Sequence, residues 1–80
     1  MSTADKVLAV LADVTELEEL RRNPEIRLYE LDIIDSLKTV ELMIALGEEF
    51  GLEISPAEFE REQWATPAKI VAFMEGRVGP

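Results

Sequence analysis

The sequence of 80 residues contains no cysteine and no histidine. Without cysteine the chain has no disulfides and no thiol nucleophile, and without histidine it has no imidazole base. The two absences together also remove the usual zinc ligands. If this chain takes part in sulfur chemistry, the sulfur must therefore come from an attached group.

Basic residues are scarce as well, because 8 Lys and Arg stand against 17 Asp and Glu and give a net charge of −9. This balance argues against nucleic acid as a partner, since such binding rests on neutralising phosphates, and it disfavours an anionic membrane surface. It favours proteins with basic patches, which are found by electrostatic steering. Acidity that serves only solubility is the alternative explanation.

No hydrophobic run is long enough to span a bilayer, and no signal peptide is visible. We therefore expect a cytoplasmic protein without stable membrane insertion. Eighty residues predict one domain over residues 1–80, with a thin core and no room for a large enzyme pocket. We expect this domain to be monomeric.

Start and stop signals divide the chain into helical segments. Ser2 and Thr66 are predicted N-caps, Thr15 begins a capping-box pattern with Glu18, and Gly51 is a stop signal. The predicted segments are residues 3–14, a short turn to about 22, residues 36–50, a short helix over 55–61, and residues 66–76, after which the chain should fray.

A long connection over residues 25–34 precedes the central helix. It is rich in large apolar side chains, so we expect it to pack over the helix ends. These side chains are Ile26, Leu28, Leu31, Ile33 and Ile34. The sum predicts an all-α fold, a small antiparallel bundle of three main helices plus one short helix with a long first loop.

The central helix over residues 36–50 carries two apolar stripes on nearly opposite sides, at about 100° per residue. The bulkier stripe consists of Leu42, Met43, Leu46 and Phe50. The smaller stripe consists of Leu37, Val40 and Ile44 and is flanked by Glu41 and Glu48. A thin core can take only one stripe, so we assign it the bulkier one. The smaller is then an exposed partner site, whereas a helix buried all round is the alternative.

Ser36 stands at the start of this helix and follows Asp35. A Ser-His-Asp device is impossible without histidine, so Ser36 is either a structural cap or the site of a modification made by another enzyme. A phosphate ester there would be favoured by the free N–H groups and the helix dipole. Asp35 caps the helix, helps to position a metal-bound phosphate donor, or does both. No calcium loop is present, so we predict no resident metal.

The residues around Ser36 resemble the attachment region of acyl carrier proteins. The matching residues are Asp35-Ser36-Leu37, Thr39-Val40-Glu41-Leu42, Leu46 and Glu48-Glu49-Phe50. A second set looks like the D-alanyl carriers of teichoic-acid D-alanylation. That set comprises Leu28-Tyr29-Glu30, Ile33-Ile34-Asp35-Ser36, Glu58-Phe59, Arg61, Trp64, Thr66-Pro67 and Ile70-Val71.

The resemblance implies a carrier protein and not an enzyme. Ser36 would receive 4′-phosphopantetheine from coenzyme A through a magnesium-dependent phosphopantetheinyl transferase, and Asp35 would assist. An aminoacyl or acyl group would ride on the arm as a thioester. An adenylating ligase or acyltransferase would load it, and a downstream transferase or condensing enzyme would unload it. The docking surface would consist of Leu37, Val40, Glu41, Ile44 and Glu48.

Three departures from the family pattern leave the pathway open. Asp32 stands where D-alanyl carriers usually have a nearby glycine, Lys38 places a cation on the recognition helix, and Gly47 replaces a common polar residue. The alternative is therefore a carrier of fatty-acid, polyketide or nonribosomal-peptide synthesis. A rival from another class is an unmodified helical adaptor in which Ser36 only caps its helix.

Overall fold

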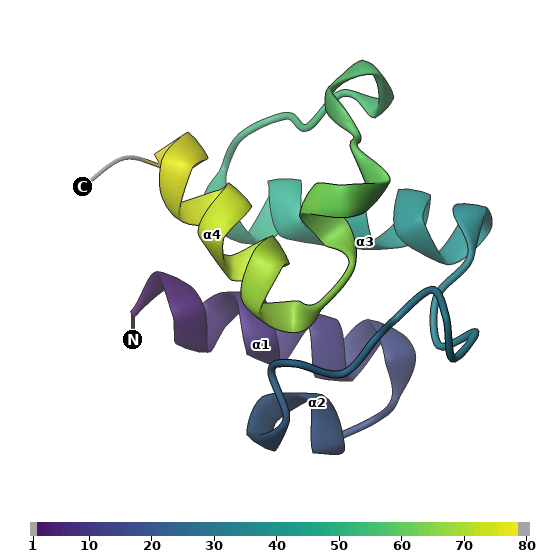
Figure 1. The fold of residues 1–80 in the computed structure, drawn as a ribbon. Coiled ribbons are helices and arrows are strands. Elements are labelled where there is room, and N and C mark those ends of the chain that lie inside the picture. Colours follow the sequence, from purple (N-terminus) through teal and green to yellow (C-terminus); the bar gives the residue numbers. More distant parts are fainter. Residues whose placement is uncertain (1, 79–80) are drawn as a thin grey trace.

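The computed structural model describes residues 2–78, and every regular element within them is helical (Figure 1). The elements are α1 (Thr3–Thr15), α2 (Glu19–Arg22), α3 (Ser36–Phe50), the 3₁₀ turns η1 (Pro56–Glu58) and η2 (Arg61–Trp64), and α4 (Pro67–Val78). The predicted all-α class and its three main helices are confirmed. No helix within this range is long and apolar enough to cross a membrane.

The other two long helices, α3 and α4, both pack against α1. Figure 1 shows α1 and α3 running in opposite directions, with α4 inclined across them. The core between these helices is apolar and includes the only tryptophan, which is fully buried. Its members are Val7, Leu11, Leu20, Leu28, Ile34, Leu42, Met43, Leu46, Ile54, Trp64, Ile70 and Met74.

The caps predicted from the sequence are mostly present. The Asp5 N–H donates to Ser2 Oγ at 3.1 Å, and Gly51 ends α3 in the left-handed conformation with φ 68°. The capping box expected at Thr15 is wrong. Thr15 is the last residue of α1 and its hydroxyl donates back to the Leu11 carbonyl at 2.8 Å. Thr15 therefore lies inside α1, and α2 begins only at Glu19, after Glu18, which makes no side-chain cap hydrogen bond.

The prediction of a short helix over 55–61 is also wrong, because two 3₁₀ turns occupy this segment. The capping box of Ser55 and Glu58 is present around η1. Phe59 and Glu60 then take extended backbone conformations, which interrupt the helix. This break directs the Phe59 ring to a place between Tyr29 and Trp64, 6.1 Å from each ring centroid.

The connection that precedes α3 is anchored by hydrogen bonds to the start of α4. The Leu28 N–H donates to the Ala65 carbonyl, and the Ala68 N–H donates to the Pro24 carbonyl, both at 2.9 Å. Leu28 is fully buried, as expected, but the prediction for Leu31 is wrong because its side chain is 60% exposed. The left-handed residue that follows, Asp32 with φ 57°, belongs to the tight turn that leaves Leu31 at its tip.

The C-terminal helix is longer than predicted and reaches Val78. Arg77 was expected to fray, yet its guanidinium forms an ion pair with Glu58 and donates to the Glu53 carbonyl at 3.2 Å. These contacts hold the last turn of α4 against η1. Residues 79–80 of the expected frayed end lie outside the described residues.

Candidate functional site

Ser36 is the first residue of α3 and its side chain is exposed. Within residues 2–78 its hydroxyl makes no hydrogen bond, because the capping role belongs to its neighbour. Asp35 Oδ1 accepts from the Lys38 N–H at 2.9 Å, and the Asp35 carbonyl accepts from the Thr39 N–H at 2.8 Å. Asp35 is therefore the cap of α3, which leaves Ser36 Oγ free to react.

The first turn of α3 is braced from below by Thr39, which is buried. Its hydroxyl donates to the Asp35 carbonyl at 2.7 Å and shares a second hydrogen bond of 2.7 Å with the Tyr29 hydroxyl. Burial raises the pKa of Tyr29, while the bond to Thr39 and the charge of Arg61 act in the opposite direction. The loop before α3 and the helix start are thus held together one turn below Ser36.

The smaller apolar stripe of α3 lies on the surface. Leu37, Val40 and Ile44 are 69%, 43% and 58% exposed. Glu41 and Glu48 are exposed as well, and Glu41 pairs with Lys38 at 3.6 Å. The alternative of a helix buried all round is excluded. The three apolar residues and two glutamates are called the docking strip below; their role in binding stays a prediction.

A groove of about 470 Å³ opens beside Ser36. It is bounded by the helix start, the loop before α3 and the two 3₁₀ turns. Its lining residues are Tyr29, Asp32, Ile34, Asp35, Ser36, Thr39, Val40, Met43, Pro56, Phe59 and Arg61. A group attached to Ser36 would therefore begin at the wall of a preformed, partly apolar surface depression.

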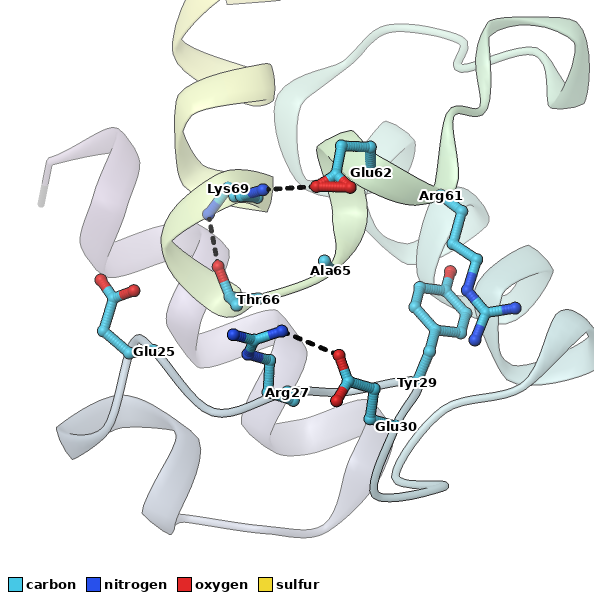
Figure 2. Close-up of a pocket in the computed structure, with 9 residues that line it drawn as sticks. All are labelled: Glu25, Arg27, Tyr29, Glu30, Arg61, Glu62, Ala65, Thr66 and Lys69. Atoms are coloured by element: carbon cyan, nitrogen blue, oxygen red, sulfur yellow. Dashed lines mark hydrogen bonds and ion pairs between the residues drawn. The ribbon is translucent and has the colours of Figure 1, made fainter.

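A second depression, of about 580 Å³, is more polar and shares Tyr29 and Arg61 with the groove. Figure 2 shows its ion pairs, Arg27 with Glu30 at 2.8 Å and Lys69 with Glu62 at 3.0 Å. The bond from Lys69 lowers the pKa of Glu62. Each cation of these pairs is matched by a carboxylate, so among the described lining residues of the depression Arg61 is the one cation without an ion pair.

Sequence reasoning missed three residues that shape the site. Thr39 and Tyr29 form the brace, and Arg61 lies over the Tyr29 ring. All three appear in the motifs that carry the family resemblance, but without a role at the site, because nothing in the local pattern of Tyr29 and Arg61 shows that they meet. Thr39 follows Asp35 by four residues, and a threonine at this spacing could have indicated a bond back to the Asp35 carbonyl.

The polar groups at the start of α3 fit a phosphopantetheine arm. Among residues 2–78 no group of three or more acidic side chains is placed to hold a metal ion. The free Ser36 hydroxyl can form a phosphodiester with an incoming phosphoryl group. The N–H groups of the first turn of α3 point toward the same end of the helix. The exposed position leaves room for a second protein to reach the oxygen.

The family model described as "Phosphopantetheine attachment site" matches residues 5–74. The chain belongs to this family, the phosphopantetheine-dependent carrier proteins. It therefore carries 4′-phosphopantetheine covalently and interacts with a phosphopantetheinyl transferase and with loading or transfer enzymes. The resemblance noted in the sequence is confirmed.

Two relatives narrow the comparison to one kind of carrier. The D-alanyl carrier protein of Staphylococcus saprophyticus is 41% identical over 75 residues, which cover 94% of this chain and 96% of the relative. The D-alanyl carrier protein of Lacticaseibacillus casei is 42% identical over 69 residues, covering 86% and 85%. This chain is thus similar to D-alanyl carriers along nearly its full length.

Proposed function

We propose that this chain holds an aminoacyl group, D-alanine foremost, as a thioester on a 4′-phosphopantetheine arm attached to Ser36. The observation that carries the proposal is the Ser36 hydroxyl, which is exposed and unbonded within the described residues at the N-terminus of α3. The two D-alanyl carrier relatives support the choice of cargo.

Attachment requires a bond between Ser36 Oγ and the phosphorus of coenzyme A that bears the pantetheine. The bond from that phosphorus to the adenosine bisphosphate breaks, and the serine proton passes to a base on the transferase. Asp35 assists by position: one of its oxygens caps Lys38, which fixes the carboxylate beside Ser36. The chain contains no histidine or cysteine and acts as the substrate of this reaction, not its catalyst.

The docking strip is the surface on which partner enzymes bind. Its apolar members are available for burial without unfolding, and its glutamates orient partners with basic surfaces. An adenylating ligase would load the arm, and a downstream transferase would take the cargo. A cytoplasmic location, a monomeric state and a single domain over residues 1–80 remain predictions from the sequence.

Mass spectrometry tests the attachment site. The apo protein is incubated with coenzyme A, magnesium and a broad-specificity phosphopantetheinyl transferase. We expect a gain of one phosphopantetheine mass in the wild type and in the control Ser2→Ala, and no gain in Ser36→Ala. A gain that survives Ser36→Ala, or no gain in the wild type, would overturn the proposal.

The cargo is tested on the modified protein with adenylating ligases, ATP and single amino acids. Loading with D-alanine by a D-alanine-activating ligase, but not with other amino acids by other ligases, supports the D-alanyl reading. Loading by a ligase or acyltransferase of fatty-acid, polyketide or nonribosomal-peptide synthesis in place of D-alanine would favour the alternative carrier class.

A further inference from the structure

The groove beside Ser36 is lined by one cationic side chain of the described residues, that of Arg61. Arg61, from η2, lies over the Tyr29 ring with its guanidinium carbon 4.8 Å from the ring centroid, as Figure 2 shows. Both side chains line the groove that also includes Ser36. Within residues 2–78 Arg61 has no carboxylate at ion-pair distance, whereas Arg27, Lys69 and other cations are paired. Its charge is therefore available to a ligand.

The ring beneath Arg61 is fixed on two sides. Tyr29 is bonded through its hydroxyl to Thr39 at 2.7 Å, and its ring meets that of Phe59 edge-on with centroids 6.1 Å apart. A cation over an aromatic face at this distance is attracted to the ring. Arg61 is thus positioned before any ligand arrives, which lowers the entropy cost of binding.

The rest of the groove complements a short amphipathic chain. Ile34, Val40, Met43 and Phe59 supply apolar lining, and Asp32 and Asp35 supply negative charge near the helix start. The volume of about 470 Å³ lies within the roughly 300–1,000 Å³ of small-molecule sites. A phosphopantetheine arm attached to Ser36 places its anionic phosphodiester at the start of α3. The two aspartates repel this anion, whereas Arg61 attracts it.

We propose that this groove is the resting site of the phosphopantetheine arm, with Arg61 facing its phosphodiester and with Val40, Met43 and Phe59 contacting the pantetheine part. The proposal rests on the attachment to Ser36 proposed above. Exposed charge pairs contribute little free energy, so the arm is held weakly. It leaves the groove readily when a partner binds the docking strip.

The absence of cysteine provides a direct probe of the arm. The thiol of the attached group is the only thiol of the modified protein, so one nitroxide can be placed on it alone. Mass spectrometry first confirms attachment to Ser36. Paramagnetic broadening of backbone amide signals then reports where the arm end spends its time. We expect the strongest broadening at residues 56–61 and less at Ile44 on the docking strip.

Arg61→Gln tests the role of the cation. Because exposed charge pairs are weak, we expect the broadening at residues 56–61 to fall by about two- to fivefold, and Arg61→Lys to restore part of it. Arg22→Gln is the matched control, since Arg22 is an exposed arginine of α2 without an ion pair in the described residues. Circular dichroism checks that each variant is folded.

Two results would overturn the inference. Broadening spread evenly over the groove and the docking strip would show that the arm does not rest in the groove. Unchanged broadening in Arg61→Gln would show that Arg61 does not hold it. A failure of the mass gain at Ser36 would instead reject the attachment site, so the two proposals fail separately.

Discussion

The two faces of α3 have similar amino acids and opposite environments. Leu46 on the inner face is fully buried, whereas Leu37 on the outer face is 69% exposed. Met43 and Ile44 are neighbours in sequence and are 4% and 58% exposed. Position around the helix, not residue type, decides which side chain enters the core.

The difference shows what the outer face is available for. Burying a large apolar side chain contributes roughly 1.5–3 kcal/mol, and the outer face leaves that contribution unused in the isolated chain. The inner face packs against α1, and the outer face ends at Ser36. A binding partner can cover this exposed apolar surface, which lies next to the proposed attachment site at Ser36.

The largest expected effect is a loss of stability when a side chain of the inner face is truncated, with little loss for the same change on the outer face. Leu46→Ala removes a fully buried side chain, and we expect it to lower the free energy of unfolding by about 2–5 kcal/mol. Ile44→Ala on the outer face should change it by less than about 0.5 kcal/mol. Urea unfolding, followed by the fluorescence of the single Trp64, measures both. Equal losses in the two variants would contradict the assignment of the faces.

The inner face of α3 also has a close backbone contact at Gly47, a position without a side chain. A Cβ at Gly47 would lie 2.6 Å from the Leu52 carbonyl oxygen, where the chain turns back after α3. Although alanine favours helices by about 1 kcal/mol over glycine, we expect Gly47→Ala to destabilise the protein by about 1–3 kcal/mol net.

Gly76 in α4 is the matched control, because a Cβ there meets nothing within 4 Å. We expect Gly76→Ala to stabilise the protein by about 0.5–1 kcal/mol. Thermal unfolding of the two variants measures the difference. Stabilisation by both substitutions would show that the approach of Leu52 to α3 is not tight.

The outer face should affect transfer without affecting stability. Replacing Leu37 and Ile44 by serine removes the two most exposed apolar side chains of the docking strip. We expect kcat/KM for modification by a phosphopantetheinyl transferase to fall about tenfold, as when a central interface contact is lost. Leu17→Ser is the control, since Leu17 is 40% exposed away from α3, in the turn between α1 and α2. An equal fall in kcat/KM for Leu17→Ser would contradict a specific role of the docking strip in binding the transferase.

Much of this contrast could be predicted from the sequence because α3 has a regular period. The bounds Ser36–Phe50, the cap at Asp35 and the stop at Gly51 agree with the structure. The stripe assigned to the core is buried through Leu42, Met43 and Leu46, with Phe50 half-buried. Helical periodicity and capping both depend on residues within one helix, so they can be recognised from residues that are close in sequence.

The parts that escaped prediction depend on contacts between distant segments. Thr15 matched a capping box, but α1 continued through it and the next helix began only at Glu19. Leu31 looked like core until the left-handed turn at Asp32 placed it at the surface. The groove needs Tyr29 and Arg61 to meet across 32 positions in sequence, which no local pattern encodes.

The smallest expected effect concerns Tyr29, which touches the inner face through Thr39. Tyr29 is the only tyrosine, so the absorbance change of tyrosinate formation reports it alone. Burial raises the pKa of Tyr29 above 10.0 in the folded protein, and we expect the midpoint to return to about 10 in urea. Since the charge of Arg61 lowers this pKa, Arg61→Gln should raise the midpoint further, whereas Arg22→Gln should leave it unchanged.

The sign of the linked effect on stability follows from the same shift. The folded state holds the Tyr29 proton to higher pH than the unfolded state does, so the stabilisation is fully present below the unfolded pKa of about 10 and is lost as pH rises through the folded pKa. Tyr29→Phe removes this part of the alkaline loss, and it also removes the bond to Thr39 that braces the start of α3. A folded midpoint equal to the unfolded one, at about 10, and unmoved by Arg61→Gln would show that the ring is open to solvent and that Arg61 does not lie over it.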